Sequence, residues 1–260
     1  MVDEPEIVSG QSLTEVLARA ASQRMPCELS LLSRGKWHKT GAAIVTATDQ
    51  AIHVELPNGR DAQPIHLQIN QPVGLSLQHE YNRYIFETVV LGLETSVNHC
   101  AGGRVILERP EKMERLQRRA YQRVSVPAGL NIKVLFWHRG YTDDWTEAPL
   151  ENYWQGRLVN LSAGGAYVTV ESDQRVNFRI RQVLGLQFTP MPHEKPILLE
   201  AQVIHLQEDA ETGTLNIGAE FLGLEAAGEP RQKLHRLREI VEKYDDENNH
   251  RPADSAVNSQ

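Results

Sequence analysis

The distribution of apolar residues divides the chain into a short helix, two series of strands and a closing helix. Ser12 has Glu15 at the third following position, and the apolar residues after it recur at helical spacing. This pattern predicts a helix that ends before Pro26. From there to Pro110 the pattern is one of short runs between turn residues, which is typical of an antiparallel barrel or sandwich. The runs are Cys27–Leu32, Ala42–Ala47, Ala51–Leu56, Ile65–Ile69, Val73–Leu77, Tyr84–Leu91 and Gly103–Leu107.

A second series of strands is predicted after a basic segment, Pro110–Gln122, that interrupts the β pattern. We place the junction between two domains in this segment. An amphipathic helix begins near Pro230, and the polar residues from Asp245 onward are expected to be disordered. The second series consists of Val124–Val126, Ile132–Trp137, Gln155–Leu161, Ala166–Val170, Val183–Phe188, Leu198–Leu206 and Leu215–Phe221.

These patterns predict an all-β protein with a few helices, built from two antiparallel β-barrels in tandem. The expected parts are an N-terminal segment with a short helix (1–25), a first barrel (26–110), a basic linker (111–123), a second barrel closed by a helix (124–245) and a disordered tail (246–260).

Composition and motifs narrow the classes of function. No apolar run approaches the roughly 20 residues of a membrane helix, and the acidic N-terminus is no secretory signal, so we expect a cytoplasmic protein without membrane insertion. The net charge of −7 argues against a protein whose whole surface binds nucleic acid. Cys27 and Cys100 are interpreted as two buried or half-buried thiols. Because phosphate-loop, zinc-protease, nucleophile-elbow and dinucleotide motifs are missing from the sequence, we expect no enzyme, no metal and no resident cofactor.

One basic segment stands out against the acidic average. Seven positive and three negative residues lie between Arg104 and Arg123. Within it, Arg118 and Arg119 are followed four residues later by Arg123, and arginine forks suit both phosphate oxygens and the guanine edge. The segment could surround a nucleotide. It could equally be a solvated linker that pairs with the acidic residues of the loop Tyr141–Tyr153.

A second segment, Val159–Val168, combines polar side chains and glycines between two predicted strands. Asn160 and Ser162 are two residues apart, so in extended chain they face the same way. Gly164 and Gly165 remove side-chain bulk where a flat group could approach the backbone. A plain turn also favours these residue types, so the segment alone leaves both interpretations open.

Together, the Arg-Arg-x-x-x-Arg and Asn-x-Ser-x-x-Gly elements resemble the PilZ domain family of receptors for the bacterial second messenger cyclic di-GMP. The sequence Asn216–Phe221 and the terminal helix are also similar to the end of that domain. Upstream, the region from Cys27 to Leu107 looks like the N-terminal barrel of YcgR-type flagellar brake proteins.

The resemblance implies a six-stranded PilZ barrel that binds cyclic di-GMP, with Arg119 and Arg123 on phosphate and guanine. Asn160 and Ser162 would hydrogen-bond a guanine edge, and Gly165 would let the ring lie close. Arg118 would contact a second ligand molecule, which gives an expected stoichiometry of two per chain.

On this basis the chain is expected to act on a protein partner, the flagellar motor or another protein, and to be recruited to the flagellar basal body. Ligand is expected to clamp an otherwise mobile linker, Lys112–Arg123, and so to change the arrangement of the domains. The alternative is a single-stranded nucleic-acid-binding barrel, against which the acidic balance and the 6% aromatic content weigh.

Overall fold

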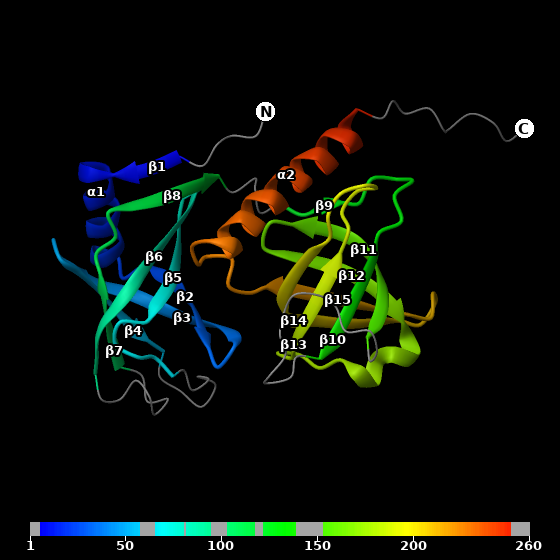
Figure 1. The fold of residues 1–260 in the computed structure, drawn as a ribbon, viewed down its shortest axis with the longest axis horizontal. Coiled ribbons are helices and arrows are strands. Elements are labelled where there is room, and N and C mark those ends of the chain that lie inside the picture. Colours follow the sequence, from blue (N-terminus) through cyan, green and yellow to red (C-terminus); the bar gives the residue numbers. More distant parts are fainter. Residues whose placement is uncertain are drawn as a thin grey trace, which may run out of the picture. The chain divides into compact units, whose positions relative to one another are not determined.

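The computed structural model describes residues 6–57, 66–80, 82–94, 103–117, 122–138 and 153–250. The chain forms two compact units, Asp3–Arg118 with Leu222–Gln232 and Arg119–Phe221 with Lys233–Gln260. Each unit is built on a closed six-stranded antiparallel barrel (Figure 1). The predicted all-β class with two barrels is therefore confirmed.

The first barrel closes because one long strand, β6 (Asn82–Leu93), pairs with both β5 (Pro72–His79) and β7 (Gly103–Glu108). The ring order is β6-β5-β2-β3-β4-β7, and it returns to β6. Buried aliphatic side chains fill its interior, as the alternation in the sequence predicts. The other strands of the ring are β2 (Pro26–Ser33), β3 (Lys36–Ala47) and β4 (Ala51–Leu56).

The N-terminal helix exists, but it begins earlier than predicted. β1 (Glu6–Ser9) leads directly into α1 (Gly10–Ser22), so the residue before the helix is Ser9 and not Ser12. The extended strand fixes this start, because β1 pairs with a strand of the first unit up to Ser9. The buried face of α1 consists of the predicted apolar residues Leu13, Leu17 and Ala20.

Two predictions in the first unit are wrong. The basic segment does not simply interrupt the β pattern, because β8 (Lys112–Gln117) pairs with β6 and β1. Met113 and Leu116 anchor β8 in the core, although charged side chains surround them in the sequence. The first half of the expected mobile linker Lys112–Arg123, the residues Lys112–Gln117, is thus a paired strand. The described part of the predicted strand Ile65–Ile69 is non-regular chain and a turn, in which the Gln71 side chain accepts a hydrogen bond from Gln68 N at 2.9 Å.

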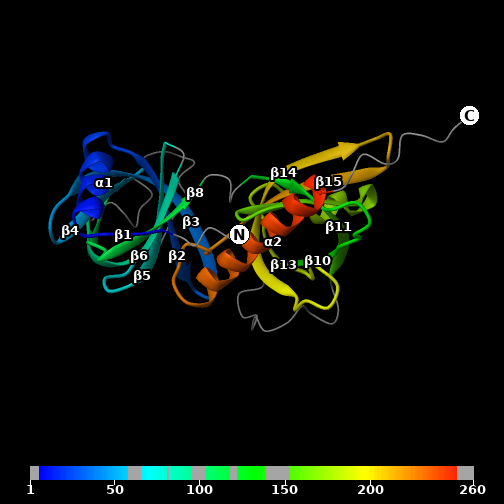
Figure 2. The same ribbon diagram turned by 90° about the horizontal axis from the view of Figure 1, so that it is seen from above.

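The second barrel has the strand order β10-β13-β14-β15-β12-β11 and closes through the pairing of β10 with β11. A short strand, β9 (Val124–Ser125), adds to the outside of β11. Figure 2 shows β14 and β15 as a long hairpin that extends beyond the other strands. The remaining elements are β10 (Lys133–His138), β11 (Trp154–Ser162), β12 (Gly165–Glu171), the 3-10 helix η3 (Ser172–Asn177), β13 (Val183–Phe188), β14 (Ile197–Asp209) and β15 (Thr214–Phe221).

The closing helix, α2 (Glu229–Asn249), extends four residues beyond the start of the expected disordered tail at Asp245. Its apolar stripe is buried, and Tyr244 Oη donates a hydrogen bond to Pro190 O at 2.5 Å, which ties the helix to the second unit. The rest of the predicted tail, from residue 251, lies outside the described residues. Within the described residues, neither helix combines the length and apolar character required to span a membrane.

Candidate ligand-binding site

A tight hairpin between β11 and β12 carries the polar motif of the second barrel. Ser162 pairs with Gly165 across a turn of Ala163 and Gly164. Ser162 Oγ donates a hydrogen bond to Gly165 O at 3.2 Å, and the serine is buried. Gly164 O accepts a hydrogen bond from Phe221 N at 2.9 Å. The turn is therefore held from within the hairpin and from the end of β15.

Gly165 has a structural reason to be glycine. A Cβ at this position would lie 2.5 Å from Ala219 O of β15, a distance that no ordinary contact permits. Gly165 pairs with Glu220, so the missing side chain is what lets β12 and β15 approach at this end. Its predicted contact with a ligand ring remains a prediction, because backbone fills the space on the Cβ side.

Asn160 and Ser162 lie on the outer face of β11. A bulge between Leu158 and Asn160 shifts the register, and regular pairing resumes from Asn160 to Ser162. Leu158 and Leu161 are both buried, so the two polar residues point away from the barrel interior, as their spacing predicts. The bulge is the local feature that turns Asn160 outward.

The side chain of Asn160 is incompletely satisfied. Its Oδ1 atom is buried and has no hydrogen-bond partner among the described residues. A buried acceptor without a donor costs about 1–3 kcal/mol, so a native protein rarely keeps one without a reason. This oxygen is therefore an acceptor for which the described residues offer no donor.

Arg123 is brought to this face by β9. Val124 pairs with Leu161 and Ser125 pairs with Asn160, so the register continues with Arg123 opposite Ser162. The Arg123 side chain is exposed, and within the part of the chain that is described it makes no hydrogen bond or ion pair. The structure thus joins the last arginine of the basic motif to the Asn-x-Ser motif, which are distant in sequence.

The other members of the basic motif cannot be placed. Arg118 and Arg119 lie outside the described residues, as does most of the acidic loop, Tyr141–Tyr153, that was weighed as their partner. Whether these arginines face a ligand or the acidic loop therefore stays a prediction.

Neither a metal centre nor a reactive thiol is found in the described ranges. They contain no group of three His, Cys, Asp or Glu side chains that could hold a metal ion. Burial, with a smaller contribution from the Glu28 carboxylate, raises the pKa of the Cys27 thiol to about 12, so this buried cysteine stays protonated at neutral pH. Cys100 lies outside the described residues.

Three residues near the site were missed by sequence reasoning. Tyr167 is the cross-strand partner of Asn160 on β12, and Ser125 is its partner on β9. Asn248, near the end of α2, donates a hydrogen bond to Ser125 O at 2.9 Å. The alternation of β12 could have placed Tyr167 on the outer face, whereas the positions of Ser125 and Asn248 depend on long-range pairing.

Comparisons with known proteins fit this geometry. Residues 117–239 match the family model for the PilZ domain. A flagellar brake protein, YcgR of Thauera aminoaromatica, is 29% identical over 125 residues, which are 47% of this chain and 45% of the relative. The match thus spans less than half of the relative's length.

Solved structures show the same fold over nearly the whole chain. The apo structure of MrkH from K. pneumonia, at 12% identity and a TM-score of 0.52, covers 95% of this chain and 99% of MrkH. A second crystal structure of MrkH gives the same identity and TM-score over 96% of this chain and 98% of MrkH. The family similarity thus covers residues 117–239, which match the PilZ domain and make up just under half of the chain.

Proposed function

We propose that this protein is a cyclic di-GMP effector rather than an enzyme. The ligand binds the outer face formed by β9, the end of β11 and the start of β12. Arg123 contacts phosphate or guanine, Asn160 Oδ1 accepts from a guanine N–H, and the Ser162 hydroxyl adds a neutral hydrogen bond.

One observation carries this proposal: a buried carbonyl without a donor, Asn160 Oδ1, lies on the same strand face as an exposed arginine without a carboxylate partner among the described residues. A guanine ring supplies N–H donors, and its phosphates supply negative charge. One guanine nucleotide could therefore supply both the donor for the carbonyl and the negative charge for the arginine.

The biological role of the protein is proposed from its similarity to known proteins. A PilZ domain next to a second barrel, together with a relative named as a flagellar brake protein, supports a role in motility control at the flagellar motor. In this proposal the protein acts in the cytoplasm, is recruited to the flagellar basal body, and changes the arrangement of its two units when ligand binds. Arg119 grips the same ligand molecule as Arg123.

Calorimetric titration of the full chain with cyclic di-GMP tests the proposed ligand. The wild type should bind, and Arg123→Ala should weaken the affinity about 10- to 150-fold, since a charge-assisted hydrogen bond contributes about 1.5–3 kcal/mol. The thermal midpoint should not change, because the side chain is exposed. Arg179→Ala, an exposed arginine of the same unit, is the matched control and should bind as the wild type does.

The same titration is repeated with a linear guanine dinucleotide and with a single-stranded oligonucleotide at two salt concentrations, and the affinities are compared with that for cyclic di-GMP. Preferential binding of the oligonucleotide, with a steep dependence on salt, would contradict the proposal and favour a nucleic-acid-binding barrel. Unchanged affinity of Arg123→Ala would remove Arg123 from the site.

A further inference from the structure

The segment Leu222–Arg231, which we call the strap, follows the last strand of the second barrel but is packed in the first unit. Leu222, Leu224 and Ala226 are buried. Gly223 has a φ of +77°, and a Cβ there would overlap the ring of Trp37. A Cβ on Gly74 of β5 would lie 2.7 Å from the backbone carbon of Glu225. The strap backbone is therefore in direct contact with the first barrel.

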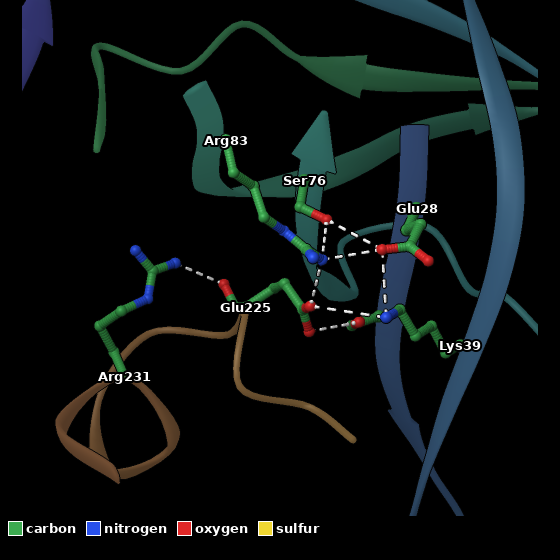
Figure 3. Close-up of polar contacts among 7 residues, drawn as sticks. Glu28, Lys39, Ser76, Arg83, Glu225 and Arg231 are labelled. Atoms are coloured by element: carbon green, nitrogen blue, oxygen red, sulfur yellow. Dashed lines mark hydrogen bonds and ion pairs between the residues drawn. The ribbon is translucent and has the colours of Figure 1, made fainter. Parts of the chain in front are cut away.

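Glu225 inserts a carboxylate into a polar cluster of the first barrel (Figure 3). It is only 5% exposed, and it accepts a hydrogen bond from Ser30 Oγ at 2.8 Å. Arg83 Nη2 donates to Glu225 Oε1 at 3.0 Å and to Glu28 Oε2 at 2.8 Å, and Lys39 Nζ lies 3.9 Å from Glu225 Oε1. A buried carboxylate is tolerated when it is paired in this way, so the cluster favours a seated strap.

The downstream end of the strap is fixed as well. Ala227 N donates to Glu87 Oε2 at 2.7 Å. Arg231 Nη1 forms an ion pair with Glu114 Oε1 of β8 at 2.8 Å, and Arg231 Nη2 donates to the backbone oxygen of Glu225 at 2.5 Å (Figure 3). Both ends of the strap are thus attached to strands of the first unit.

The residue before the strap is attached to the candidate ligand site. Phe221 N donates to Gly164 O in the turn between β11 and β12, and Ala219 O occupies the space beside Gly165. Leu222, the next residue, is already buried with the strap. Phe221, which is bonded to the β11–β12 turn, is followed directly by Leu222, the first residue of the strap. A movement of the turn therefore strains the contacts of the strap, and a movement of the strap strains those of the turn.

We propose that the strap couples cyclic di-GMP binding to the first barrel: a seated strap holds the Asn160–Gly165 turn ready for ligand, and ligand in turn holds the strap seated. This inference rests on the proposed function. The sign follows from pre-organisation, because a turn already ordered by Phe221 loses less conformational freedom when ligand binds. Linkage makes the coupling reciprocal, with the same factor in both directions.

Two unrelated substitutions loosen the strap in the full chain. Glu225→Ala removes the buried carboxylate, and Gly74→Ala places a methyl group against the strap backbone without changing charge. Each should weaken cyclic di-GMP binding by at least about fivefold, the low end of typical coupling between sites. Ile52→Val is the control, since it loosens the first barrel's core on β4, a strand that none of the strap contacts above involves.

Hydrogen exchange supplies the reverse measurement. Saturating cyclic di-GMP should slow the exchange of the strap amides, including that of Ala226, which donates to Gly223 O. If the wild type does not bind cyclic di-GMP, the proposed function fails, and the coupling with it. If the wild type binds but both strap variants bind within twofold of it, the coupling alone is overturned. Equal weakening in Ile52→Val would also overturn it, because general destabilisation would then explain the effect.

Discussion

Asn160 is a residue at which folding and binding make opposite demands. Its buried Oδ1 has no donor among the described residues, which weakens the free protein, and in the proposed function it is the acceptor for a ligand N–H. On the same barrel Asn216 is satisfied, because its Oδ1 accepts a hydrogen bond from Thr169 Oγ1 at 2.8 Å. The two asparagines therefore allow a direct comparison.

Asn160→Leu should leave the free energy of unfolding unchanged or raise it, since an apolar side chain of similar size removes an unsatisfied group. The same change should lower cyclic di-GMP affinity about tenfold, for a hydrogen bond of roughly 1–1.5 kcal/mol. Urea unfolding and calorimetry measure the two effects. Asn216→Leu is the control and should destabilise, because it leaves Thr169 without its partner. A clear loss of stability in Asn160→Leu would mean that the carbonyl is already satisfied.

At the scale of elements, the end of β15 determines how closely β12 can approach. Gly165→Ala should reduce the free energy of unfolding by about 1–3 kcal/mol, the usual cost of overpacking, because its Cβ would meet Ala219 O at 2.5 Å. Gly41→Ala on β3 is the control, since nothing lies within 4 Å of a Cβ there. Equal unfolding midpoints for both variants in urea would contradict the proposed packing role of Gly165.

The polar cluster of the first barrel predicts a sensitivity to acid. Burial acts to raise the pKa of Glu28, but Lys39 and Arg83 outweigh it and hold the pKa below its ordinary value of 4.5. A carboxyl with a lowered pKa in the folded state stabilises the protein at neutral pH. This contribution is lost as the pH falls below 4.5 and through the lowered pKa.

Glu28→Gln should therefore lose less stability than the wild type between pH 7 and pH 3, measured by urea unfolding at each pH. Glu15→Gln, which removes an exposed carboxylate on α1, should lose as much as the wild type. The same loss in all three proteins would show that the pairing of Glu28 does not contribute to acid sensitivity.

The sequence predicted those elements whose apolar residues alternate without interruption. β4 and β13 agree residue for residue, and the apolar stripe of α2 was predicted, although buried Arg238 was not. β8 was missed because its buried residues among the described side chains, Met113 and Leu116, are three residues apart, a spacing that suits a helix and not a strand. The strap was missed because its partners are remote: Glu225 pairs with Arg83, and no local pattern records that contact.

For the site, spacing was sufficient to put Asn160 and Ser162 on one face, and the family resemblance connected them with Arg123. The unsatisfied carbonyl was beyond sequence reasoning, since it depends on the bulge at Leu158 and on β9 beside it. Gly165 was recognised as part of the motif, but its packing role was not predicted. That role depends on Ala219, which lies on another strand and leaves no room for a Cβ at Gly165.

At the scale of the whole molecule, ligand stoichiometry remains a prediction that depends on Arg118. In the proposed site Arg119 and Arg123 hold one cyclic di-GMP, and a planar cation at Arg118 could stack on a second molecule or form a bidentate hydrogen bond with it. Calorimetric titration should give two ligands per chain for the wild type and one for Arg118→Leu. A value near one in both proteins would refute the prediction and favour pairing of Arg118 with the acidic loop.

The central claim is that one outer face of the second barrel receives cyclic di-GMP, and nuclear magnetic resonance of the labelled full chain tests it most directly. On titration, the largest shift changes should occur at the backbone amides of Arg123, Ser162 and Gly165 and at the side-chain amide of Asn160. Smaller changes should follow along Phe221 into the strap. Changes concentrated elsewhere in the chain, or none at saturating ligand, would contradict the account.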